Sequence, residues 1–180
     1  MLRDFNLLIS TGRGNGSKCS SELWFILGEV GISEQVIDRT DFSGLLVAKV
    51  NVDPFKAIKM LREYVVKRPW DIRYLLKVTP IEIVVDTSLG NIFEAAKKLA
   101  SKISEEETYR VTVNKRGVDL ETSSLVEAAA KAVNRKVDLK KPDKILLVEV
   151  LGSVTGLSVV REEDILSISK IKERYLKGEE

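Results

Sequence analysis

Short apolar runs alternate with helical patterns along the first part of the chain, and this order limits the folds that the chain can adopt. The runs typical of strands lie at residues 6–10, 35–38, 45–50 and 73–79. One helical pattern ends at Gly31, and the next begins at Asp53-Pro54, where aspartate can cap the helix and proline suits its first position. Strand, helix, strand, strand, helix, strand is the order of a ferredoxin-like fold.

The remaining sequence continues with a similar mixture of strands and helices. Asn91 with Glu94, and Ser124 with Glu127, have the spacing of capping boxes and predict two helix starts. The expected extended segments lie at residues 81–85 (strand or linker), 109–113, 145–151 and 157–160. In the segment 109–113 the residues alternate, so Arg110 should face away from the side chains of Tyr109 and Val111.

These patterns predict a mixed α+β chain with two domains. The hydrophobic content of 44% in 180 residues is enough for one large core or two small ones. We expect a ferredoxin-like domain at 1–80, a second domain at 81–170, and a polar tail at 171–180 that frays.

The complete absence of histidine is the most informative feature of the composition. Histidine is the usual group for proton transfer near neutral pH and a common metal ligand. The single cysteine, Cys19, excludes an internal disulfide and any multi-cysteine metal site. We therefore expect no enzyme, no cofactor and no bound metal. No apolar run is long enough to cross a bilayer, so we expect a cytoplasmic protein.

The positive charge is local, because the whole chain has a net charge of only +2. From Arg110 to Lys144, nine lysines and arginines stand against five acidic residues, a surplus of four. Such a basic segment in a nearly neutral protein is typical of a surface that contacts nucleic acid.

Three segments, taken in their order along the chain, resemble a THUMP domain, an RNA-binding module of tRNA-modifying proteins. They are residues 74–81 (YLLKVTPI), 109–117 (YRVTVNKRG) and 137–150 (VDLKKPDKILLVEV), within a match over roughly 73–168. The first half is similar to the ferredoxin-like part that precedes THUMP in the stand-alone branch, through residues 9–16, 22–31 and Phe42-Ser43-Gly44.

The resemblance implies an RNA-binding adaptor. It implies recognition of the acceptor end of tRNA, including the single-stranded CCA terminus. The stand-alone branch supports tRNA acetylation, in which a separate acetyltransferase forms N4-acetylcytidine. Because the sequence stops after the THUMP-like part, we expect the chemistry of this tRNA modification to belong to that partner.

The residues that we expect to contact RNA follow from charge, position and this resemblance. The first are Arg110, Lys115 and Arg116, which can reach adjacent phosphates. The others are the helix-start residues Thr122, Ser123 and Ser124, the lysines Lys136, Lys140 and Lys141, and four weaker candidates, Arg13, Lys18, Arg73 and Lys77. For Arg73 and Lys77, pairing with Glu82 or Asp86 is the favoured alternative.

Two other functions stay open on the sequence alone. The glycine-rich loop from Gly12 to Lys18 could serve a nucleotide-dependent tRNA-processing enzyme, although no Ser or Thr follows the lysine as a Walker motif requires. The chain could also be a protein-interaction module without direct RNA binding. Trp24, Phe25 and Trp70 are expected in the core, and Cys19 is expected to be a buried filler.

Overall fold

The computed structural model describes residues 1–178 and divides them into two compact units. The first unit is Met1–Pro80 together with the segment from Asp164 onward, and the second is Ile81–Glu163. Each unit has its own sheet and its own hydrophobic core, so the expected mixed α+β class is confirmed. No helix of the described chain is long and apolar enough to cross a membrane.

The first unit begins with a ferredoxin-like order of elements. These are β1 (Leu7–Ser10), α1 (Gly16–Glu29), β2 (Gln35–Arg39), β3 (Leu45–Val50), α2 (Pro54–Lys67), the short 3-10 helix η1 (Pro69–Asp71) and β4 (Lys77–Pro80). The antiparallel sheet has the order β10-β4-β1-β3-β2, with β10 (Leu166–Ser167) added at the edge. The carboxylate of Asp53 accepts the N–H groups of Phe55 and Lys56 at 2.9 and 3.1 Å, which confirms the predicted start of α2.

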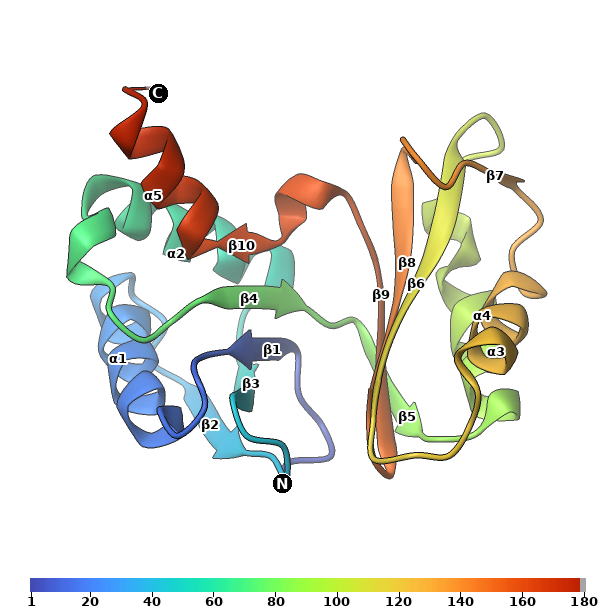
Figure 1. Cartoon of the computed structure of the whole chain (residues 1–180), viewed down its shortest axis with the longest axis horizontal. Coiled ribbons are helices and arrows are strands. Elements are labelled where there is room, and N and C mark those ends of the chain that lie inside the picture. The colour runs from blue at the N-terminus through green and yellow to red at the C-terminus, as the bar shows by residue number, and fades with distance from the viewer. Residues whose placement is uncertain (179–180) are drawn as a thin grey trace. The chain divides into compact units, whose positions relative to one another are not determined.

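The predicted fraying of the C-terminal segment is wrong. After β10 the chain forms helix α5 (Ile168–Leu176), whose residues Ile168 and Ile171 are 1% and 8% exposed within the core of the first unit. The two isoleucines lie on one face of the helix, and β10 pairs with β4 to bring them there (Figure 1). The last two residues of the predicted tail, Glu179 and Glu180, lie outside the described residues.

The expectation that three aromatic residues belong to the core is also wrong. Trp24, Phe25 and Trp70 are 64%, 53% and 51% exposed. In α1 the buried face is formed by Cys19, Leu23, Ile26 and Leu27. Their helical period turns the two intervening aromatic residues towards solvent.

The second unit is built around one long strand. Its elements are β5 (Ile83–Asp86), α3 (Leu89–Leu99), η2 (Ala100–Lys102), β6 (Thr108–Arg116), α4 (Thr122–Ala130), β7 (Lys136–Val137), β8 (Lys144–Leu151), β9 (Val154–Val160) and η3 (Glu162–Asp164). The sheet has the order β5-β9-β8-β6-β7, with β6 parallel to β7 and β8. Helices α3 and α4 pack on one face of this sheet (Figure 1).

Both predicted capping boxes of this unit are wrong. The hydroxyl of Ser88 accepts the N–H of Asn91 at 3.0 Å, so α3 is capped three residues before Asn91. Helix α4 starts at Thr122, before Ser124, and its N-cap Glu121 makes no capping bond through its side chain. Since serine and asparagine both favour caps, spacing alone could not choose between neighbouring polar residues.

The alternation predicted for β6 is confirmed. Tyr109 is 1% exposed, packs in the core with Val111 and Val113, and donates its hydroxyl to the carbonyl of Val133 at 3.2 Å. Arg110 and Arg116 therefore lie on the opposite face of the sheet, at the two ends of the strand.

Candidate nucleic-acid interface

The predicted basic segment does not form a single surface, because β6 separates its cations. Six residues of extended chain place the backbones of Arg110 and Arg116 about 20 Å apart. Parallel pairing brings Lys136 opposite Thr108, at the amino end of β6, whereas α4 begins just beyond its carboxyl end (Figure 1). We name the two sets of predicted residues the amino-end cluster (Arg110, Lys136, Lys140 and Lys141) and the carboxyl-end cluster (Lys115, Arg116, Thr122, Ser123 and Ser124).

Arg110 and Asp138 shape the loop of the amino-end cluster. The guanidinium of Arg110 donates to the carbonyl of Leu139 at 3.1 Å. The carboxylate of Asp138 accepts the N–H groups of Lys140 and Lys141, both at 3.0 Å, and the hydrogen bonds from Lys141 and Lys140 lower its pKa. These contacts use backbone groups of the loop, so the ammonium groups of the two lysines are left to point into solvent.

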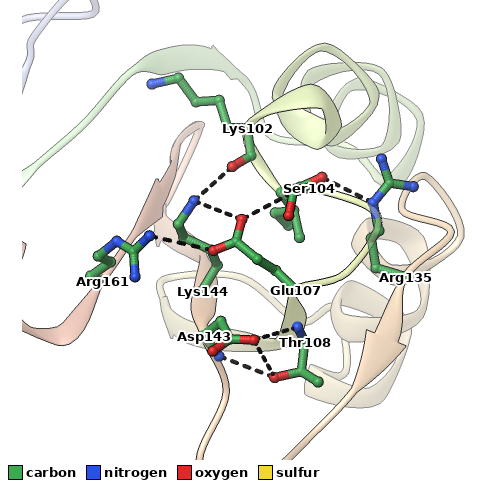
Figure 2. Close-up of polar contacts among 9 residues, drawn as sticks. Lys102, Ser104, Glu107, Thr108, Arg135, Asp143, Lys144 and Arg161 are labelled. Atoms are coloured by element: carbon green, nitrogen blue, oxygen red, sulfur yellow. Dashed lines mark hydrogen bonds and ion pairs between the residues drawn. The ribbon is translucent and has the colours of Figure 1, made fainter.

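A second polar network fixes the chain beside this cluster. Glu107 accepts the backbone N–H of Ser104 at 3.0 Å and forms ion pairs with Lys144 at 3.2 Å and Arg161 at 3.4 Å (Figure 2). The hydrogen bond from Ser104, followed by the contact with Lys144, lowers the pKa of Glu107. Lys144 also donates to the carbonyl of Lys102 at 2.8 Å, so its charge is engaged in holding the α3–β6 connection.

The local charge surplus belongs entirely to the amino end. Between Arg110 and Lys144, the amino-end cations are Arg110, Arg135, Lys136, Lys140, Lys141 and Lys144, and the acids beside them are Asp138 and Asp143. The other three cations of this range are matched by three acids, Asp119, Glu121 and Glu127. Within residues 1–178, no ion pair involves Lys136, Lys140 or Lys141. These three lysines are exposed and free to meet phosphates.

The cations of the carboxyl-end cluster are held by the protein itself. Arg116 lies 2.8 Å from the carboxylate of Glu149, whose side chain is only 5% exposed and also accepts from Asn114 at 2.9 Å. The ammonium of Lys115 donates to the carbonyl of Leu120 at 2.8 Å but stays exposed. Sequence reasoning missed Glu149, because a glutamate inside an apolar strand gives no sign of which strand residue it will face.

The start of α4 completes the carboxyl-end cluster. Thr122, Ser123 and Ser124 form its first turn, where the helix dipole favours an anion. Within the described residues, the side chain of the N-cap Glu121 makes no capping bond to these amides, in contrast to α3, which Ser88 caps. The carboxylate of Glu121, 3.5 Å from the hydroxyl of Ser123, opposes an anion at this place.

The four weaker candidates all belong to the first unit. Lys18 lies 5.6 Å from the centre of the Tyr74 ring, and the carboxylate of Glu22 accepts the N–H of Arg73 at 2.8 Å, so α1 brings Lys18 and the segment at Arg73 together. Arg13 lies in the loop before α1, and Lys77 pairs with Ser10 at the start of β4. Glu82, a predicted partner for Arg73 or Lys77, forms its ion pair with Lys102.

The glycine-rich loop makes a tight turn before α1. Gly14 has a φ of 79°, which favours glycine, and Gly44 of the neighbouring hairpin packs so closely that a Cβ would lie 2.8 Å from the carbonyl of Thr11. Beside the loop is a shallow cavity of about 220 Å³. Cys19 is buried, and burial raises the pKa of its thiol to about 11, so it is an inert filler as predicted.

The fold of this chain occurs in several solved structures. PH1313 from Pyrococcus horikoshii Ot3 superposes with a TM-score of 0.63 at 18% identity, over 91% of this chain and 55% of that one. A possible methylase from Clostridium difficile 630 has a TM-score of 0.53 at 14% identity, over 86% and 40%. A 4-thiouridine synthetase, solved in complex with RNA and bound ATP, has a TM-score of 0.53 at 14% identity, over 91% and 42%. At these identities the likeness concerns the fold alone.

These comparisons correct the expectation that the chain is not an enzyme. The structures that share its fold include a synthetase and a possible methylase, each of which is more than twice as long as the part that this chain covers. The expectation rested on the lack of histidine and of an added domain. The same fold is part of enzymes, so neither feature separates this chain from them.

Sequence comparison matches a domain family within the second unit. A "THUMP domain-containing protein 1 homolog" from Drosophila melanogaster is 32% identical over 96 residues, which are 49% of this chain and 30% of the fly protein. The chain therefore spans less than a third of that relative. The THUMP domain model matches residues 86–160, a range that includes both clusters at the ends of β6. Residues 86–160 are a THUMP domain, as the resemblance in sequence implied.

Proposed function

We propose that this chain binds tRNA at its acceptor end and presents it to a separate cytidine acetyltransferase, which forms N4-acetylcytidine. One observation carries the proposal: a THUMP domain in which the surplus of positive charge is gathered at one end of β6. The RNA complex of the structurally similar 4-thiouridine synthetase supports RNA as the ligand. The step to acetylation rests on the resemblance of the whole chain to the stand-alone adaptor branch.

The two clusters have different chemistry, and we assign them different parts of the tRNA. The exposed lysines Lys136, Lys140 and Lys141 suit the phosphates of a duplex, which bind through charge and carry no sequence information. The carboxyl-end cluster offers hydroxyls, helix amides and Lys115, a set that suits the phosphates and riboses of a single-stranded terminus. The CCA end is thus assigned to Lys115 and the start of α4.

A thermodynamic cycle tests this division. The affinity of the wild type and of Lys115→Ala is measured for intact tRNA and for tRNA without its CCA end. If Lys115 contacts the terminus, trimming costs the wild type more than the variant, with a coupling energy of about 0.5–3 kcal/mol. The matched control is Lys136→Ala/Lys140→Ala/Lys141→Ala, which should weaken both tRNAs by the same factor. Unchanged affinity of the wild type for trimmed tRNA would refute the assignment of the CCA end.

Lys115 is the appropriate residue for this test, because its neighbour Arg116 has a structural role. Removal of Arg116 would leave the buried carboxylate of Glu149 without its cation and would mix folding with binding. Lys115 donates only to a backbone carbonyl at the surface.

The acetylation step needs its own experiment. Mass spectrometry of tRNA nucleosides from cells without this protein should show a loss of N4-acetylcytidine, and the wild-type gene should restore it. The triple lysine variant should restore it poorly if RNA binding is required. Normal N4-acetylcytidine in the deletion strain would contradict the acetylation role and leave RNA binding to be judged by affinity alone.

A further inference from the structure

Helix α1 presents two largely exposed aromatic side chains to solvent. Trp24 and Phe25 are 64% and 53% exposed. Successive residues of a helix are about 100° apart, so these rings stand on either side of a strip that contains Ser21 and Gly28. Both of these small residues are exposed, and a Cβ at Gly28 would meet no atom within 4 Å. The surface between the two aromatic rings is therefore open to solvent.

Four exposed cations surround the amino-terminal half of this face. Lys18 lies one turn before Ser21, with its ammonium over the ring of Tyr74, and Arg39 from β2 contacts the hydroxyl of Ser17. Arg13 precedes the helix in the glycine-rich loop, and Arg73 lies against the helix through its backbone. The positive charge comes from three separate parts of the chain and converges on one helix.

Two of the acids near these cations accept backbone N–H groups, Asp38 from Arg39 at 2.9 Å and Glu22 from the segment at Arg73, while the exposed Glu29 lies at the far end of the helix. The carboxylate of Glu22 accepts the N–H groups of Arg73, Tyr74 and Leu75 at 2.8, 3.0 and 2.7 Å. Its charge is spread over three short hydrogen bonds. The amino-terminal half of the face, with its four cations, therefore favours an anionic occupant over a basic or neutral apolar one.

We propose that this face of α1 binds single-stranded RNA, with bases stacked on Trp24 and Phe25 and phosphates held by the surrounding cations. Aromatic platforms next to a basic track are the usual means by which proteins hold single strands without reading their sequence. The proposal rests on the proposed function to the extent that RNA is the ligand of this chain. It adds a contact surface in the first unit to the two clusters of the second unit.

Trp70 shows why exposure alone does not make such a platform. Its ring has Lys172 at 5.5 Å and Tyr175 in an edge-on contact at 6.0 Å, so its surfaces already have partners. For Trp24 no ring or cation contact occurs within the described residues. The two tryptophans of the chain are therefore a matched pair, one with open ring faces and one with occupied ones.

Tryptophan fluorescence can report on each of the two rings separately. Trp70→Phe leaves Trp24 as the single tryptophan, and Trp24→Phe leaves Trp70. Each variant is titrated with polyuridylate as the single-stranded probe. We expect saturable quenching in Trp70→Phe and none in Trp24→Phe. Quenching confined to the variant that keeps Trp70 would overturn the proposal.

Affinity provides the second readout. Trp24→Ala/Phe25→Ala should weaken binding of polyuridylate about tenfold or more, the usual effect of losing a stacking platform, while Trp70→Ala should not. Both variants change exposed residues, and equal thermal midpoints would confirm that they fold. Unchanged affinity of the double variant overturns the proposal, even where Lys136→Ala/Lys140→Ala/Lys141→Ala weakens tRNA and so upholds the proposed function.

Two further outcomes would assign the face to another occupant and thereby overturn the proposal. The first is unchanged RNA affinity together with self-association of the wild type that Trp24→Ala abolishes, as seen by sedimentation. The second is unchanged RNA affinity of Trp24→Ala/Phe25→Ala together with loss of its binding to a purified cytidine acetyltransferase.

Discussion

The two ends of strand β6 carry cations of the same kind, yet the protein uses them differently. At the carboxyl end, Arg116 is paired with the buried Glu149, and Lys115 is bonded to a carbonyl. At the amino end, Asp138 binds backbone amides and leaves the ammonium groups of Lys140 and Lys141 free. The comparison teaches that the number of cations in a segment says little until each is assigned a partner.

The largest effect that we expect comes from Arg116→Ala. It removes the cation facing a carboxylate that is 5% exposed, and we expect a loss of about 3 kcal/mol in the free energy of unfolding. Chemical denaturation measures it, with Lys115→Ala as the neighbouring control. Arg116→Ala/Glu149→Gln should recover part of the loss. Equal stability of Arg116→Ala and Lys115→Ala would mean that the ion pair with Glu149 does not hold Arg116 in a structural role.

The next effect concerns RNA affinity at the amino end. Lys136→Ala/Lys140→Ala/Lys141→Ala should reduce the slope of log affinity against log salt by about three, since each lysine that meets a phosphate contributes roughly one. Binding of tRNA measured at several salt concentrations gives this slope. The control is Lys97→Ala/Lys98→Ala, two exposed lysines at the end of α3. Equal slopes for both variants would mean that the free lysines of the loop have no special role.

A smaller effect is expected for Arg110→Ala. Loss of the 3.1 Å hydrogen bond to Leu139 should destabilise the loop of the amino-end cluster by about 1 kcal/mol. Hydrogen exchange at the amide of Asp138, which donates to Tyr109 at 3.0 Å, reports on this loop. Arg110→Lys keeps the charge but not the fixed planar geometry, so it should protect the amide less than the wild type does. Unchanged exchange in Arg110→Ala would show that Asp138 alone shapes the loop.

The smallest effect is the pH dependence contributed by Glu107. Its pKa is lowered in the folded protein, so its stabilisation is present above its ordinary value near 4.5 and is lost as the pH falls through the lower folded value. At neutral pH, Glu107→Gln should lower the free energy of unfolding by less than about 1 kcal/mol, because the group is only partly shielded from water. Denaturation at pH 7 and at a series of lower pH values measures this loss.

The matched control for Glu107 is Glu105→Gln, a change at an exposed neighbour in the same connection. The difference between wild type and Glu107→Gln should shrink as the pH falls below 4.5, whereas Glu105→Gln should follow the wild type throughout. A difference that does not change with pH would exclude the ion pairs with Lys144 and Arg161 as its cause.

Local sequence signals predicted the elements of the fold well. Asp53-Pro54 placed the start of α2, Gly31 ended α1, and the alternation around Tyr109 gave the buried face of β6. Each of these depends on residues close in the chain, where backbone geometry and side-chain period act directly. The helix caps Ser88 and Glu121 were missed because several polar residues competed within one turn.

The sequence by itself determined which residues are charged, where most of the helices and strands form, and that residues 86–160 are a THUMP domain. Only the tertiary structure decided that Arg110 and Arg116 are separated along a strand, that Glu149 neutralises one of them, and that Trp24 and Phe25 are left uncovered. The reason is physical. Charge and periodicity are properties of the chain itself. The residues that pair with a charge or pack over an aromatic ring lie far away in sequence and are brought together by strand pairing and helix packing.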